Sequence, residues 1–125
     1  MSPEETAEAY IQHYQTGDKK DSWAVREVDL LIETMPDEAW DLTCILIRKS
    51  SADDVLAFVA AGPLEELLVK HGPVLMARVE DECKRNDRLV LALSGVWLEA
   101  GTPVFERWYA LMFKYGFAEG TRRGL

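Results

Sequence analysis

Few side chains of this sequence could do acid–base chemistry or bind a metal. The sequence has two histidines, His13 and His71, which stand far apart, and no HExxH or similar pair occurs. His71 comes at the end of an apolar stripe and directly before a glycine. We therefore expect it to bond a helix carbonyl or to meet the helix dipole, with a functional role as the alternative.

The two cysteines, Cys44 and Cys83, have neither CxxC spacing nor neighbouring histidines. This pattern argues against a zinc site or a redox motif and predicts free, buried thiols. The sequence does not start like a secretion signal, and its longest uncharged run, Leu89 to Leu98, is far shorter than the ~20 residues that span a bilayer. We therefore expect a cytoplasmic protein that does not span a membrane.

Adjacent acidic residues occur twice in the second half of the chain. Glu65 and Glu66 follow Pro63 in the first turn of an expected helix, where acids complement the helix dipole. Neighbours on a helix point about 100° apart, so this pair does not predict a general acid and base. The run Glu80–Glu82 lacks the oxygen-rich loop of a calcium site and is typical of a solvated face.

Nucleophile and phosphate motifs are missing as well. Ser94-Gly95 lacks the GxSxG frame, and no glycine-rich phosphate loop is present. The sequence therefore predicts no catalytic residue, no metal site and no cofactor.

The elements that position these side chains are predicted to be helices. Apolar residues recur at helical spacing between glycine, proline and asparagine punctuation. The expected helices are 6–15, ended by Gly17; 22–35; 36–49, apolar around most of its circumference and hence central; 51–61; 63–72; 73–83; 87–100, ended by Gly101; and 103–115.

The most regular feature is the repeated junction Gly62-Pro63 and Gly72-Pro73. Glycine can take the left-handed conformation that ends one helix, and proline suits the first turn of the next. Both junctions are therefore predicted to be helix-to-helix corners with almost no loop.

These elements predict one all-α domain over residues 1–116, followed by a polar tail over 117–125. We expect about seven or eight short helices in a compact array of helical hairpins, either HEAT-like or an irregular α-bundle, because no constant repeat period emerges. The tail, with Arg122 and Arg123, is expected to be disordered or to form a weak basic arm.

The charge is distributed unevenly. The net charge is −8; residues 1–55 hold thirteen acidic and five basic residues, whereas residues 56–125 hold nine of each. The simplest interpretation is a solvated surface. The asymmetry would also repel nucleic acid and attract a basic partner to the first half.

Several segments carry a family resemblance. They are Val59-Ala60-Ala61-Gly62-Pro63-Leu64-Glu65-Glu66-Leu67-Leu68, His71-Gly72, Arg78-Val79-Glu80, Arg88, Ala92-Leu93-Ser94-Gly95-Val96-Trp97, Asp37-Glu38-Ala39-Trp40 and Phe105-Glu106-Arg107-Trp108. Over roughly residues 20 to 112 the chain resembles an uncharacterised bacterial family of small stand-alone helical proteins. That resemblance implies no activity.

Two functional hypotheses follow. The first is a non-enzymatic acidic domain that binds a basic protein, of the type of the immunity proteins that neutralise bacterial toxins. Its contact residues would be Asp29, Glu33, Asp37, Glu38 and Asp41, and its oligomeric state is left open. The alternative is a small-ligand or regulatory domain with a site around Glu65, Glu66, His71 and Trp97.

Overall fold

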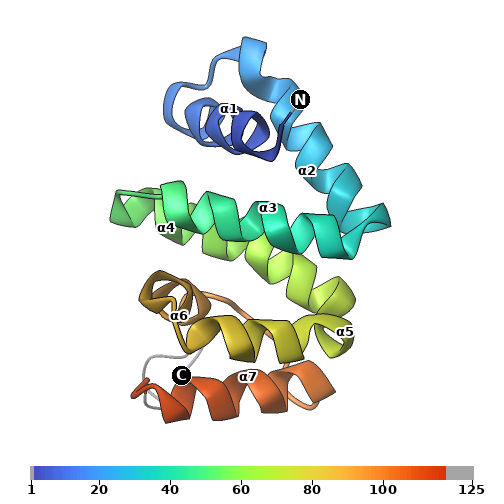
Figure 1. Ribbon diagram of the computed structural model, residues 1–125, viewed down its shortest axis with the longest axis vertical. Helices are drawn as coiled ribbons and strands as arrows, with labels where there is room; N and C mark the ends of the chain where they lie inside the picture. The colour runs from blue at the N-terminus through green and yellow to red at the C-terminus, as the bar shows by residue number, and fades with distance from the viewer. Residues whose placement is uncertain (1, 118–125) are drawn as a thin grey trace.

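The structure, a computed structural model, describes residues 2–117. All the regular elements in this range are helical, and no strand occurs among these residues. The helices stack in layers along the long axis of the molecule, with α1 and α7 at opposite ends (Figure 1). The predicted all-α class is confirmed.

The first layer consists of α1 (Pro3–Thr16), the 3₁₀ turn η1 (Lys19–Asp21) and α2 (Ser22–Thr34). Helix α1 begins earlier than the predicted Thr6 because Ser2 and Glu5 form a capping box. The Ser2 hydroxyl accepts the Glu5 N–H, and the Glu5 carboxylate accepts the Ser2 N–H. As predicted, the helix ends at Gly17, whose φ of 71° is left-handed.

Helix α3 (Pro36–Lys49) is central, as its apolar circumference predicted. It packs on α1 and α2 on one side and on α5 and α6 on the other. Its buried residues are Ala39, Trp40, Leu42, Thr43, Leu46 and Ile47. Any side chain on the remaining polar strip of α3 is therefore held on a fixed support.

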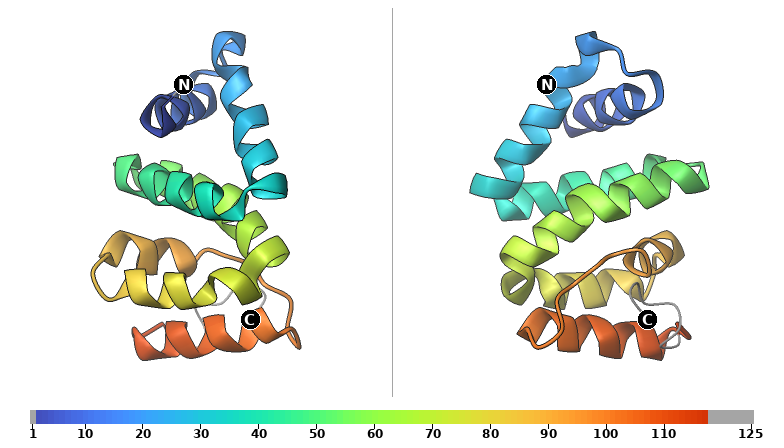
Figure 2. Two further views of the ribbon diagram at one scale, coloured as in Figure 1. Left: turned by 45° about the vertical axis from the view of Figure 1, so that its right-hand side comes forward. Right: turned by 180° about the vertical axis from the view of Figure 1, so that it is seen from behind.

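The predicted corner at Gly62-Pro63 is wrong. Helix α4 (Asp53–Val59) runs through the π-helical turn η2 (Ala60–Leu64) into α5 (Glu65–Cys83), so one expected helix boundary is missing (Figure 2). Pro63 has no N–H for the i−4 carbonyl and its ring crowds that carbonyl. The wider π turn accommodates both defects without ending the helix.

A corner does occur at Gly72-Pro73, but the glycine is not left-handed. The non-helical residue is His71, with φ −132° and ψ 16°, and α5 kinks there. Gly72 is required for another reason: a Cβ on it would lie 2.9 Å from the Cβ of Val104 in α7. The glycine lets the first turn of α7 pack against the corner.

Helix α6 (Asp87–Leu93) ends well before the predicted Gly101. A turn at Ser94-Gly95 ends it, and the chain then crosses the molecule, extended over residues 96–99, to α7 (Pro103–Lys114) (Figure 2). Val96 and Leu98 are buried while Trp97 between them is 45% exposed, which is the alternation of extended backbone. The N-cap residues of the two helices, Asn86 and Thr102, each accept a backbone N–H.

Helix α7 packs Val104, Trp108, Leu111 and Met112 into the core. Trp108 and Met112 are buried, and the indole N–H of Trp108 donates to the Leu93 carbonyl of α6 at 2.9 Å. Phe117, which we assigned to the polar tail, packs against the core. The rest of that predicted tail, 118–125, lies outside the described residues.

Candidate functional site

The five acidic residues predicted to bind a partner are all exposed on α2 and α3. Three of them contact cations of α5 that are distant in the sequence. Glu33 pairs with Lys70, while Asp37 and Asp41 each accept an N–H of the Arg78 guanidinium at 3.1 Å. We call these five exposed residues the acidic face; their role in binding stays a prediction, and part of their charge is balanced within the chain.

Lys70 joins α2 to α5 through two carboxylates. Its ammonium donates to Glu33 and lies 3.6 Å from Glu66. The hydrogen bond from Lys70 holds the pKa of the Glu33 carboxyl below its ordinary value, and the same bond raises the pKa of Lys70. All three groups are exposed, so water screens the interaction.

The residues of the predicted small-ligand site take part in three separate contacts. The Glu65 carboxylate accepts the backbone N–H of Trp97 at 2.6 Å and so fixes the extended connection to α5. Glu66 faces Lys70 instead, as expected for helix neighbours that point in different directions. The tertiary structure thus joins Glu65 with Trp97 and joins Glu66 with Lys70.

His71 makes the third contact of this set. Its Nε2 lies 2.7 Å from the main-chain carbonyl oxygen of Ile32 in α2. Because a carbonyl can only accept, Nε2 carries the proton. A carbonyl partner was predicted for this histidine, and the structure provides one on a neighbouring helix.

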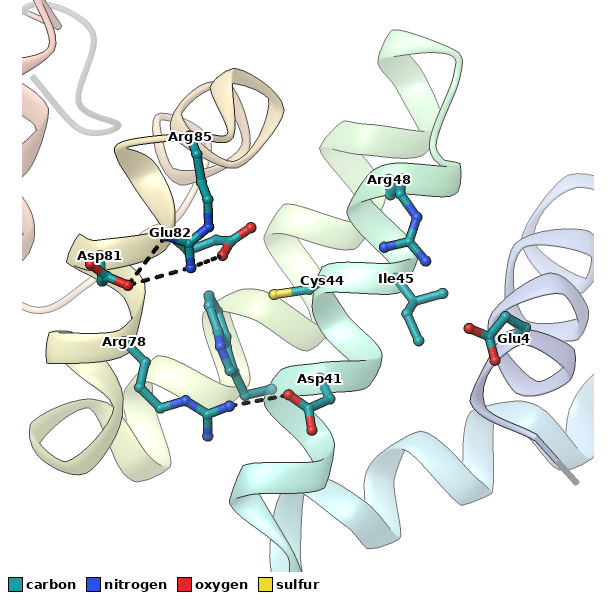
Figure 3. Close-up of a pocket in the computed structure, with 10 residues that line it drawn as sticks. Glu4, Asp41, Cys44, Ile45, Arg48, Arg78, Asp81, Glu82 and Arg85 are labelled. Atoms are coloured by element: carbon teal, nitrogen blue, oxygen red, sulfur yellow. Dashed lines mark hydrogen bonds and ion pairs between the residues drawn. The ribbon is translucent and has the colours of Figure 1, made fainter.

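A groove that the sequence did not predict runs along α3. It consists of two adjoining hollows of about 460 and 520 Å³ that share Cys44, Arg48 and Glu82. We call it the α3 groove. The first hollow is further lined by Glu4, Trp40, Asp41, Ile45, Arg78, Asp81 and Arg85, and the second by Ser50, Ser51, Asn86 and Arg88. Figure 3 shows α3 as its floor, with α1 on one side and the end of α5 on the other.

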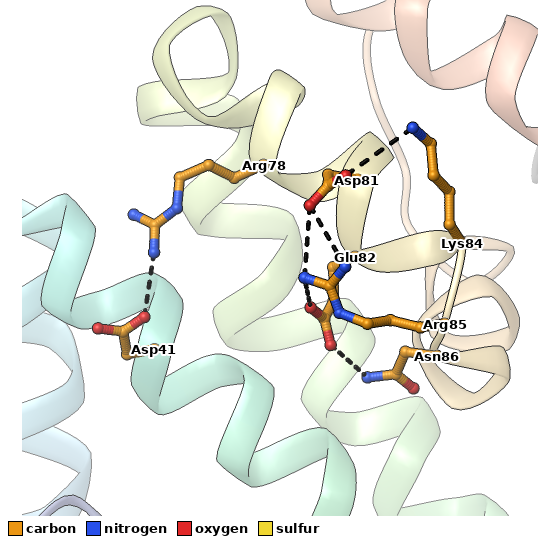
Figure 4. Close-up of polar contacts among 7 residues, drawn as sticks. All are labelled: Asp41, Arg78, Asp81, Glu82, Lys84, Arg85 and Asn86. Atoms are coloured by element: carbon orange, nitrogen blue, oxygen red, sulfur yellow. Dashed lines mark hydrogen bonds and ion pairs between the residues drawn. The ribbon is translucent and has the colours of Figure 1, made fainter.

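The α5 wall of the groove is built from local ion pairs (Figure 4). Arg85 lies 3.0 Å from Glu82 and 3.3 Å from Asp81, and the Asn86 amide donates to the other Glu82 oxygen at 3.3 Å. Lys84 lies 3.8 Å from Asp81. Such i,i+3 and i,i+4 pairs keep this wall in one arrangement but contribute little to stability.

Cys44 lies in the floor of the groove and is not an activated nucleophile. Burial raises the pKa of its thiol to about 12, and the carboxylates of Glu82 and Asp41 add to the effect. A reactive cysteine needs a lowered pKa. The part of the chain that the structure describes also holds no cluster of three or more His, Cys, Asp or Glu side chains able to bind a metal ion.

Fold and site together define a class: a small, layered α-helical domain with a charged groove and an acidic face. No helix within residues 2–117 is long and apolar enough to cross a membrane. A comparison with known protein families gives a more specific assignment than this class. A model of the family of unknown function DUF6869 matches residues 12–113, and the chain belongs to that family. Comparisons with curated proteins and with solved structures find no match.

The resemblance of the sequence to an uncharacterised helical family is thereby confirmed. The groove was missed because its walls come from α1, α3, α5 and α6, which only the tertiary structure brings together. One feature of the sequence could have indicated the groove. Arg48 and Arg88 are cations without an acidic residue three or four positions away on their own helix.

Proposed function

We propose that this protein is a non-enzymatic, acidic protein-binding domain that engages a basic partner through α2 and α3. One observation carries the proposal: Asp37 and Asp41, one helical turn apart, hold a guanidinium between them. Arg78 binds these two carboxylates within the chain in the way that we propose an arginine of the partner would bind them.

The exposure of this face supports the proposal. The side chains of Asp37 and Asp41 are 80% and 67% exposed although both are paired with Arg78. Asp29 and Glu38 extend the face on α2 and α3 and are exposed too. A basic partner would therefore meet carboxylates on a rigid, well-packed support, and the attraction would be fast and sensitive to salt.

The partner class that fits this chemistry is a protein with a cationic cleft. Nuclease toxins have such clefts, so an immunity or inhibitor role is the specific form of the proposal. The cytoplasmic location and the HEAT-like character of the helix array likewise stay predictions.

The small-ligand alternative around Glu65, Glu66, His71 and Trp97 has weaker support. The polar groups of Glu65 and His71 each hold another segment of the chain in place, through the Trp97 N–H and the Ile32 carbonyl respectively. A ligand at these residues would have to replace contacts that join the helices.

A capture experiment with two double variants tests the proposal. Wild-type protein is immobilised and exposed to an extract of the cells it comes from, beside D29K/E38K and the matched control E99K/E106K. We expect a basic protein that binds wild type and control but not D29K/E38K, with affinity that falls as salt rises. Equal capture by both double variants, or no specific capture by wild type, would refute the proposal.

A further inference from the structure

The second hollow of the α3 groove lies between the C-terminal end of α3 and the α5–α6 junction. It measures about 520 Å³ and is lined by Cys44, Arg48, Ser50, Ser51, Glu82, Asn86 and Arg88. This volume falls within the range of sites that hold small molecules, roughly 300–1,000 Å³. Its lining contains several hydrogen-bond donors and one carboxylate.

That carboxylate, Glu82, is already matched. One of its oxygens lies 3.0 Å from the Arg85 guanidinium, and the other accepts the Asn86 amide at 3.3 Å. Its negative charge is therefore balanced on the α5 side of the hollow. Glu82 therefore provides no counter-charge for the two other arginines of the hollow, Arg48 and Arg88.

Arg48 is the first of these arginines. It is exposed on α3 and lines both hollows, yet among residues 2–117 no carboxylate lies within ion-pair distance of its guanidinium. An arginine has five N–H donors in a planar fork and stays charged at any physiological pH.

Arg88 is the second, and it is held in position. It is partly buried, and its Nη2 donates to the main-chain carbonyl of Ser50 at the end of α3. That bond uses a neutral acceptor, so the positive charge of Arg88 remains uncompensated while its orientation is fixed. The guanidinium is thus pre-organised, which lowers the entropic cost of binding a ligand.

From this arrangement we propose a second binding site in the α3 groove, for a small molecule that carries a carboxylate or phosphate group. The oxyanion would lie between Arg48 and Arg88, with the Ser51 hydroxyl as a further donor. The rest of the hollow would hold the organic part of the ligand. The site does not rest on the acidic face, and it is the feature by which an acidic protein could bind an anion.

A titration followed by amide NMR tests this site with two probes, inorganic phosphate and citrate, at ionic strength matched with sodium chloride. We expect saturable shifts at the amides of Arg48, Ser51, Asn86 and Arg88 with at least one probe. Preference for phosphate would assign a phosphate ester as ligand, and preference for citrate a carboxylate.

Variants separate a built site from general screening of charge. R48Q should weaken the probe by about tenfold or more. R48K keeps the charge but loses the planar fork, so it should lie between R48Q and wild type. R26Q removes an exposed arginine of α2 and should bind like wild type. Linear, unsaturable shifts with both probes, or equal affinity of R48Q and wild type, would overturn the proposal.

Discussion

The imidazole of His71 donates a hydrogen bond to the main-chain carbonyl of Ile32, and Pro36 is the reason that this carbonyl is available. In a continuing helix, the Ile32 carbonyl would accept the N–H of residue 36, and proline has none. The N–H of Met35 makes the regular helical bond to the Leu31 carbonyl and does not use that of Ile32. His71 thus provides a donor for the partly buried Ile32 carbonyl, which has no helical N–H partner at the α2–α3 junction. The bond also connects α5 to that junction.

Replacing His71 by alanine should therefore lower the free energy of unfolding by about 1–3 kcal/mol, because the Ile32 carbonyl loses its donor. His13 provides a matched control, since its Nδ1 contacts the Asp18 carbonyl at an exposed position. His13→Ala should cost less than about 0.5 kcal/mol because water can replace the bond. Urea denaturation at neutral pH measures both, and equal losses would contradict this role of His71.

The two Gly-Pro junctions should respond unequally to alanine. Gly72→Ala should destabilise the fold by about 1–3 kcal/mol, because its methyl group would collide with Val104. At Gly62 a methyl group would meet the Tyr10 hydroxyl at an ordinary 3.5 Å, and, as at Gly72, it would crowd the ring of the proline that follows. The crowding by proline is common to both variants, so Gly62→Ala should cost at least about 1 kcal/mol less than Gly72→Ala. Thermal unfolding of both variants checks the contrast.

Stability should fall as the pH rises above about 9. Burial raises the pKa of Cys83 from 9.0 and that of Tyr10 from 10.0, in each case to about 12. Between the two values the unfolded chain has released a proton that the folded chain keeps, so each group lowers stability by up to about 1.4 kcal/mol per pH unit. Below pH 8 neither group contributes.

Denaturant unfolding between pH 8 and 11 measures this slope. Tyr10→Phe removes one of the titrating groups and keeps the ring that packs against Phe58. The fall in stability above pH 10 should therefore be shallower in this variant than in wild type. An identical slope would contradict the role given to Tyr10.

Removing Arg78 should affect partner binding more than stability. Its two ion pairs with Asp37 and Asp41 are exposed, so Arg78→Ala should change the free energy of unfolding by less than about 1 kcal/mol. On the proposed function, the uncovered aspartates should bind a basic partner faster and more tightly. Association kinetics at low and high salt measure this.

Lys84→Ala is the matched control for that experiment. It removes the same charge from an exposed ion pair with Asp81, a residue of α5 that is not among the proposed contact residues. Faster association in both variants would point to net charge alone. Unchanged or weaker binding in Arg78→Ala would contradict the proposed contact.

The sequence by itself predicted those features of the protein that depend on neighbours along the chain. The stop at Gly17, the helix starts at Asp87 and Pro103, and the central position of α3 rest on residues within one or two helical turns. The confinement of the net negative charge to residues 1–55 is likewise a property of the sequence.

Tertiary structure alone decided how the Gly-Pro junctions behave and which charges meet. Gly62-Pro63 and Gly72-Pro73 are locally alike, but only the second has α7 packed against it through Val104. Lys70, Arg78 and His71 reach partners 37 to 41 residues earlier in the chain. Such pairs produce no periodic pattern in the sequence. The two residues of a pair meet because whole helix faces pack together and are buried, and their spacing along the chain does not predict which faces pack.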